Sequence, residues 1–163
     1  MKTILKTAVF CSFLWMTANA YSQATFVAKT GDDELDVTLT ELNVSASVDL
    51  DAFKIDMVRT YGVLETHVDN LFVNFGMTAG DVFMTLEIAK QVKKPITDVA
   101  ECFKKNNGKG WGVIAKEMGI KPGSAEFKAL KVSAKEKKTK AKAKESQKKN
   151  NAKPVDKGKV KTK

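Results

Sequence analysis

The sequence has very few of the side chains that carry out catalysis or hold metal ions. His67 is the only histidine, which disfavours a Ser/His/Asp triad and excludes a metal site with several histidines. No motif links His67 to Cys102 as a nucleophilic pair. The sequence does not exclude paired carboxylates for glycoside hydrolysis, but it lacks the aromatic-rich pattern of a sugar-binding cleft. We therefore predict that the protein is not an enzyme, and we expect no cofactor.

Long apolar runs are also missing. The most apolar segment is a short run near the start of the chain. Residues 1–20 have the three parts of a secretory signal peptide. Lys2 and Lys6 precede the apolar run, and Ala18-Asn19-Ala20 supplies the small residues that signal peptidase needs. The run is too short to remain as a membrane anchor. Cleavage follows either Ala20 or Ala24, and we expect a soluble mature protein that is exported to the periplasm or the extracellular space.

Cysteine is nearly absent, with Cys11 in the leader and Cys102 in the mature chain. Phe10 precedes Cys11 where a lipoprotein signal needs a small residue, so we do not expect a lipid anchor. A single thiol excludes an intrachain disulfide in the mature protein. Cys102 either pairs with another chain or, as is more common, is buried as a small apolar residue.

Arginine is reduced to one residue, Arg59, and lysine supplies the remaining positive charge. Residues 128–163 hold fifteen lysines and three acids, whereas residues 21–127 hold eleven basic and sixteen acidic residues. Lysine is a mobile point charge without the planar fork of arginine, so a lysine-only tail indicates non-specific, salt-sensitive binding to polyanions. The alternative is a solvated tail that only keeps the protein soluble. The predicted polyanion-binding residues are Lys135, Lys137, Lys138, Lys140, Lys142, Lys144, Lys148 and Lys149.

Large apolar residues are scarce in this tail. Residues 135–163 cannot bury enough surface to offset the entropy of ordering, so we predict a disordered segment from Lys135 onward. Its first part is rich in Ala, Lys and Glu and is able to extend the preceding helix for a few turns. Pro154 and Gly158 end that tendency.

Residues 24–134 have the length and hydrophobic pattern of one small, mainly α domain. Within 35–48, apolar residues alternate with polar ones, which predicts a strand or a short hairpin. From Asp49 the period becomes helical, and the stop and cap residues predict a compact bundle of five or six short helices. The predicted helices are 49–61, ended by Gly62; 64–75, ended by Gly76; one capped by Thr78; one starting at Pro95; 111–118, ended by Gly119; and one capped by Ser124.

The glycine-rich stretch Lys104–Ser124 allows three interpretations. Its glycine spacing, and its position after a helix, do not fit a dinucleotide or Walker loop. A helix-turn-helix is also disfavoured, because the second helix would begin with Glu126 and Phe127, which are poor groups for reading base edges. We predict that Gly108 and Gly110 form a joint between packed helices, with Trp111 against Phe103 or Phe127. The remaining alternative is a binding surface at Lys105, Lys109 and Lys121.

Acidic residues gather at Asp32, Asp33, Glu34 and Asp36, and a second pair is formed by Asp49 and Asp51. Neither group follows the spacing of an EF-hand loop, so Ca²⁺ binding is disfavoured. We predict solvated acids at the starts of helices or strands.

Residues 81–131 resemble a family of small exported bacterial proteins that has no known activity. The resemblance rests on KP-x3-V at Lys94–Val99, on GKGWGVIAKEMGIKPGS, and on EFKALK. The resemblance implies only an exported location and a related fold. The sequence Ala-Asn-Ala-Tyr-Ser-Gln is similar to export signals of Bacteroidota-type bacteria.

Three functions are compatible with the separation of charge along the chain. The leading prediction is an exported, non-enzymatic protein whose lysines bind lipopolysaccharide, extracellular DNA or acidic polysaccharide. The second is a protein–protein adaptor that acts through its helical surface, with the tail as a solubiliser. The third is contact between the basic tail and the acidic domain of the same or another copy.

Overall fold

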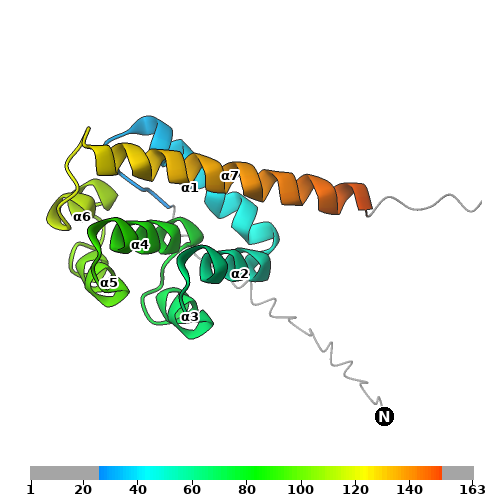
Figure 1. Cartoon of the computed structure of the whole chain (residues 1–163), viewed down its shortest axis with the longest axis horizontal. Helices are drawn as coiled ribbons and strands as arrows, with labels where there is room; N and C mark the ends of the chain where they lie inside the picture. Colours follow the sequence, from blue (N-terminus) through cyan, green and yellow to red (C-terminus); the bar gives the residue numbers. More distant parts are fainter. Residues whose placement is uncertain (1–25, 152–163) are drawn as a thin grey trace, which may run out of the picture.

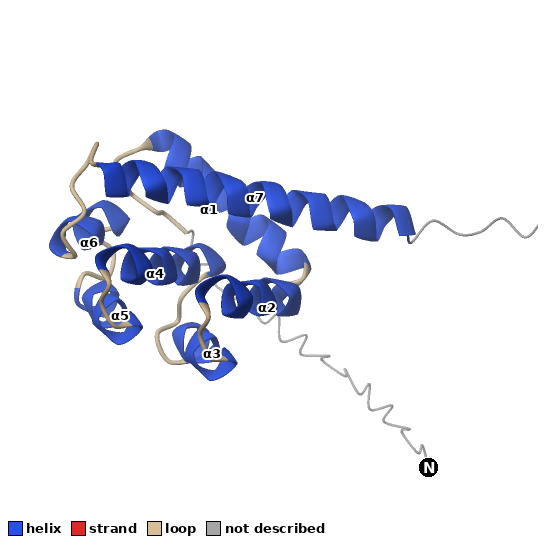
Figure 2. Cartoon of the chain, viewed as in Figure 1, coloured by secondary structure: helices blue, strands red, loops and turns tan. Residues whose placement is uncertain are grey.

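The computed structural model describes residues 26–151, which form a bundle of α-helices without a strand in that range (Figure 2). The mainly α fold is confirmed. The predicted signal peptide, 1–20, lies outside the described residues. The helices are α1 (Asp33–Val48), α2 (Leu50–Tyr61), α3 (Glu65–Val73), α4 (Ala79–Val92), α5 (Ile96–Lys105), α6 (Trp111–Glu117) and α7 (Ala125–Asn151).

Helix α4 forms the centre of the bundle. Every residue from Ala79 to Ala89 is buried, as expected for a helix that neighbours cover on all sides. It contacts α1, α2, α3, α5 and α7, and it lies between α7 on one side and α3 and α5 on the other (Figure 1). Thr78 and Asp81 form a reciprocal capping box at its start. The predicted cap at Thr78 is therefore confirmed.

The strand or hairpin predicted at 35–48 is wrong, because this segment is helix α1. Leu35, Leu39, Leu42 and Ala46 recur every three or four residues and are all buried. Apolar residues at nearly every second position satisfy the periods of a strand and of a helix at once. The helix forms because Asp32 caps its first turn and the buried side chains fill the space against α4 and α7.

The disordered tail predicted from Lys135 onward is contradicted as far as Asn151, because α7 continues through the expected boundary at Ala134. Ala, Lys and Glu have high helix propensity, which favours the extension. Ala134 and Lys137 are buried, and Ala141 packs against the core. The first half of α7 is thus part of the domain. Residues 152–163 lie outside the described range.

The glycine stretch joins α5 to α6 and α6 to α7, as predicted. Gly108 and Gly110 have φ values of 79° and 94°, and Trp111 stacks on Phe103 with ring centroids 5.4 Å apart. The structure adds a reason for glycine that the sequence did not predict, which is the close approach of another backbone segment to Gly110 and Gly112. The extended residues 28–30 lie against the start of α6, where Trp111 N donates to Ala28 O at 2.7 Å and Gly112 N donates to Lys29 O at 3.0 Å.

Gly112 is expected to tolerate no side chain. A Cβ atom there would lie 2.7 Å from Thr30 O, a backbone atom that cannot yield without breaking the contact. We expect G112A to lower the free energy of unfolding by about 1–3 kcal/mol and to expose the amides of residues 111 and 112 to hydrogen exchange. V113A, at an exposed position of the same helix α6, is the control. Equal exchange at 111 and 112 in both variants would contradict this role for Gly112.

Candidate anion-binding surface on α7

One row of lysines on α7 faces α1. Lys131, Lys135, Lys138 and Lys142 are three or four residues apart, so they share one side of the helix. Lys131 Nζ lies 2.7 Å from Asp32 Oδ2, and Lys135 Nζ lies 2.6 Å from Glu34 Oε1. Further along, Glu41 Oε2 lies 3.2 Å from Lys138 Nζ and 2.9 Å from Lys142 Nζ. The pairs advance in the same direction on both helices, so α1 and α7 run parallel along this seam.

These ion pairs change the acidity of the α1 carboxyl groups. The hydrogen bond from Lys131 lowers the pKa of Asp32, with a further contribution from the backbone N–H of Leu35. Hydrogen bonds from Lys135 and then Lys131 lower the pKa of Glu34. Lys142 and Lys138 lower the pKa of Glu41 in the same way. The acids of α1 therefore occupy positions that the anionic groups of an external polymer would otherwise take.

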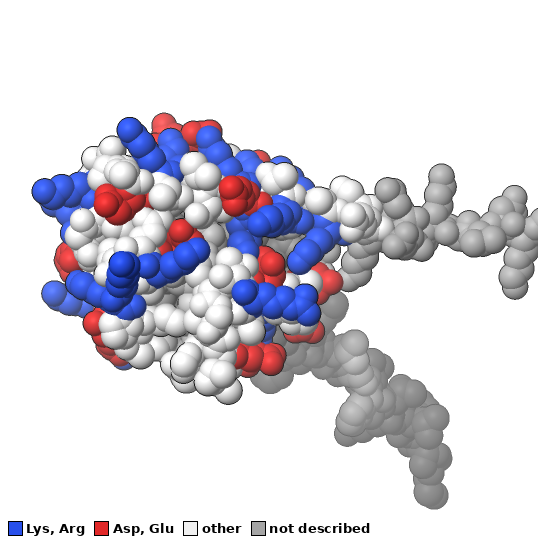
Figure 3. Space-filling model, in the orientation of Figure 1, with Lys and Arg blue, Asp and Glu red and all other residues white. Residues whose placement is uncertain are grey.

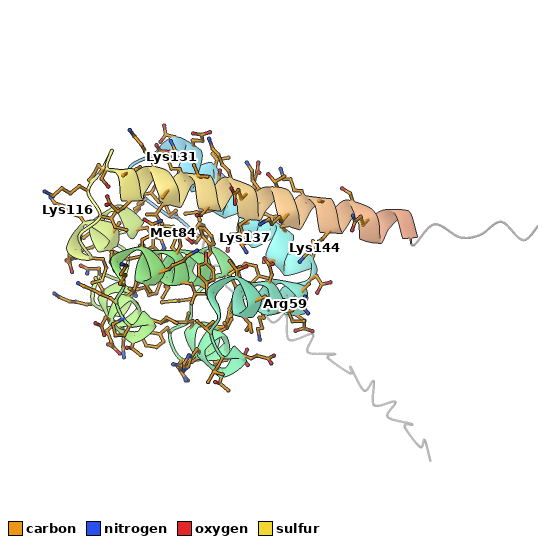
Figure 4. The ribbon with its side chains drawn as sticks, in the orientation of Figure 1. Arg59, Met84, Lys116, Lys131, Lys137 and Lys144 are labelled. Atoms are coloured by element: carbon orange, nitrogen blue, oxygen red, sulfur yellow. The ribbon has the colours of Figure 1, made fainter. Side chains whose placement is uncertain are left out.

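A second row of lysines faces α2. Lys137 Nζ lies 2.8 Å from Asp56 Oδ2, donates to Thr60 Oγ1 at 2.8 Å, and lies 6.0 Å from the centroid of the Tyr61 ring. Lys137 is 5% exposed, so an external polymer does not reach it, contrary to its place among the predicted binding lysines. Lys144 follows Lys137 by two turns on α7 (Figure 4). Its Nζ lies 3.8 Å from Asp56 Oδ1.

The remaining predicted lysines differ in how far they face solvent. Lys140 is exposed and forms no ion pair within residues 26–151. The side chains of Lys135, Lys142 and Lys144 are 48%, 55% and 59% exposed despite their acidic partners, whereas Lys138 is 25% exposed. The side chains of Lys148 and Lys149 lie outside the described part of the structure. Lysine and acidic side chains alternate on the face shown in Figure 3.

A pocket opens beneath this surface, between the end of α1, the start of α2, and α7. Its volume is ≈ 80 Å³. The apolar part of its lining comes from all three helices, and the polar part includes lysines of α7. The apolar lining residues are Leu42, Ala46, Val48, Ala52, Phe53 and Ala141. The ionisable lining residues are Asp49, Asp56, Lys137, Lys140 and Lys144.

A second pocket, of ≈ 290 Å³, lies between α3 and the start of α5. Its apolar walls include Leu71, Phe75, Ile96 and Ala100, and no lysine or acid lines it. His67 is exposed on α3 and lines this pocket.

Cys102 is buried, as predicted, and its Sγ lies 3.4 Å from Glu117 Oε2. Burial raises the pKa of the thiol, and the hydrogen bond to Glu117 adds to that shift. A raised pKa disfavours the thiolate, which is the reactive form. Lys105 lies 3.9 Å from the same Glu117 carboxylate, and Lys109 donates to Asn106 Oδ1, so both lysines contribute to the α5–α6 joint.

The acidic residues near Asp32 accept hydrogen bonds that stabilise the start of α1. Asp32 Oδ1 accepts from Leu35 N at 2.9 Å, and Asp36 Oδ1 accepts from Thr30 N and from Thr30 Oγ1. Within residues 26–151, no three His, Cys, Asp or Glu side chains are grouped so as to hold a metal ion.

Comparison with known proteins returns nothing similar. No family model matches the chain, and no curated protein or solved structure matches it at a significant level. The resemblance of 81–131 to small exported proteins therefore stays a prediction. None of the helices in residues 26–151 combines the length and apolar character needed to cross a membrane.

Two features of this surface were missed by the sequence argument. Glu34 and Glu41 are seven residues apart, and the α7 lysines from Lys131 to Lys142 recur with a period close to three and a half. This spacing places both sets on matching helix faces and was the available signal. The matching helix faces are not apparent when residues 35–48 are interpreted as a strand or hairpin.

Proposed function

We propose that the protein is an exported, non-enzymatic protein that binds anionic polymers through the exposed lysines of α7. The observation that carries the proposal is the group Lys135, Lys140, Lys142 and Lys144, which keeps much of its ammonium surface in solvent although acids lie nearby. From Lys135 to Lys144 the helix rises about 14 Å. Lys135 and Lys142 lie on its α1 side and Lys140 and Lys144 on its α2 side, so a polyanion along α7 passes between two pairs of ammonium groups. Lysine gives no bidentate base readout, which makes the binding non-specific.

The helical form of the tail reduces the number of charges that bind. A disordered polycation would bring nearly all of its lysines to a polymer, but here Lys137 is buried and Lys138 is mostly covered. Binding to duplex DNA should therefore depend on salt with a slope set by roughly four to six lysines. A chain ending at Ala134 is a poor test, since it also removes the core contacts of Lys137 and Ala141.

The sharper test neutralises charge and keeps the helix. In the full mature chain, we expect K135Q/K140Q/K142Q/K144Q to reduce the salt slope on duplex DNA by about 3 to 4 units, and to weaken binding to lipopolysaccharide and heparin as well. Binding is measured by fluorescence anisotropy across a salt series, with the melting temperature checked for each variant. The matched control, K93Q/K94Q/K104Q/K116Q, removes four exposed lysines outside α7. Equal losses in the two variants would place the binding elsewhere.

A second function, a protein–protein adaptor, is favoured by the outer side of α1. Val37, Val44 and Val48 are 57%, 64% and 52% exposed, and their spacing puts them on one side of the helix. Leu50, at the start of α2, is 41% exposed. Exposed apolar residues that share one face are typical of interaction surfaces.

A further inference from the structure

We propose that the pocket between α1, α2 and α7 takes the acyl chain of an anionic lipid, with Lys140 and Lys144 holding its head group. This inference rests on the proposed function and names the substrate class. Among the anionic polymers considered, DNA and acidic polysaccharide have no hydrocarbon chain that could fill an apolar pocket. A lipid with phosphate or carboxylate groups has both the chain and the charge.

The floor of the pocket suits a hydrocarbon chain. Leu42, Ala46 and Phe53 are buried core residues, and they line it together with Ala52 and Ala141. The alanine at 141 leaves space that a larger residue would fill. The volume of ≈ 80 Å³ is several times the roughly 10–15 Å³ that one water molecule occupies on the same measure. It therefore admits a short stretch of a single chain and excludes a bulky ring system.

Three lysines and two acids, Asp49 and Asp56, line the pocket, so its net charge favours an anionic ligand. Lys137 is already held by Asp56 and Thr60, so its charge is largely compensated. Lys140 and Lys144 are four residues apart on the same side of α7, and both are exposed. Lys140 forms no ion pair in the described range, and Lys144 is at 3.8 Å from an Asp56 carboxylate that Lys137 binds more closely. These two ammonium groups complement an anionic head group beside the apolar floor.

Val48 extends the apolar surface out of the pocket. It lines the pocket and is 52% exposed, which places a hydrophobic side chain next to the mouth. The part of the acyl chain that does not fit inside the pocket would lie across this side chain.

The test uses dodecanoyl lysophosphatidylglycerol below its micelle concentration, titrated into the full mature chain by calorimetry. We expect saturable binding at one site, strengthening about fourfold per methylene across a series of shorter chains until the pocket is full. Glycerol 3-phosphate, which lacks the chain, and dodecanoyl lysophosphatidylcholine, which has a zwitterionic head, are expected to bind at least tenfold more weakly.

Two variants fill the pocket from two different helices. A141L adds a side chain from α7 and S45L adds one from α1, and either is expected to weaken lipid binding at least tenfold without changing heparin binding. A143L adds the same side chain at an exposed position of α7 and is expected to bind lipid normally. Using two separate walls covers the case in which one variant does not fold.

The outcomes separate this inference from the proposed function. If A141L and S45L bind the lipid as A143L does, or if the chain-free phosphate binds as well, the pocket proposal is overturned even where heparin binding persists. If a chain ending at Asn151 binds the lipid much more tightly, residues 152–163 are the natural occupant of the pocket and the proposal also fails. If lipid binding responds to the pocket variants while heparin and DNA do not bind, the pocket stands and the polymer-binding function fails.

Discussion

Replacement of Trp111 by alanine is expected to lower the free energy of unfolding by about 3–5 kcal/mol, the range for removal of a large buried aromatic residue. Trp111 is 2% exposed and stacks on Phe103. Its indole Nε1 donates to Asp81 Oδ1 at 2.7 Å. The same Asp81 closes the capping box of α4, so one carboxylate joins the central helix to α6. The loss should shift the urea midpoint strongly downward.

The variant W111F separates the hydrogen bond from the packing. Phenylalanine retains most of the ring contact but leaves Asp81 Oδ1 without its buried donor, which should cost about 1.5–3 kcal/mol because the acceptor is charged. Urea unfolding followed by circular dichroism measures both variants. V113A, at an exposed position of α6, serves as the control, with an expected change below about 0.5 kcal/mol. A W111A midpoint close to the wild-type value would contradict the central role of this side chain.

Neutralising the acids of α1 is expected to strengthen polyanion binding. E34Q/E41Q removes the partners of Lys135, Lys138 and Lys142, so these lysines become available to the polymer. We expect affinity for duplex DNA at low salt to rise roughly 10-fold, with a salt slope about 1 unit steeper, because Lys138 joins lysines that already bind. The same anisotropy series that tests the lysines measures both quantities.

The control for this experiment makes the same change in net charge at other positions. Asp33 and Glu65 are exposed and form no ion pair in the part of the chain that the structure describes, so D33N/E65Q serves this purpose. If the two double variants gain affinity equally, total charge governs binding and the seam between α1 and α7 has no special role. A gain confined to E34Q/E41Q would show that the acidic face of α1 competes with the polymer.

Short-range signals in the sequence located most helix ends correctly. Gly62 adopts the left-handed conformation that ends α2, Thr78 caps α4, and Ser124 Oγ accepts from Phe127 N at the start of α7. These assignments succeeded because a cap or a positive φ angle depends on a few neighbouring residues. The predicted export signal is likewise a local pattern, and it stays a prediction.

The sequence by itself determined the helical segments from residue 49 to the start of α7, most of their ends, and the excess of lysine at the end of the chain. The tertiary structure decided the rest. Residues 35–48 satisfied two periodicities, and only packing of Leu39 and its neighbours against α4 and α7 made them a helix. Lys137 resembles the other tail lysines in sequence, but α2 places Asp56 and Thr60 around its ammonium group. Burial and charge pairing depend on residues distant in the chain, so composition and spacing along one helix do not specify them.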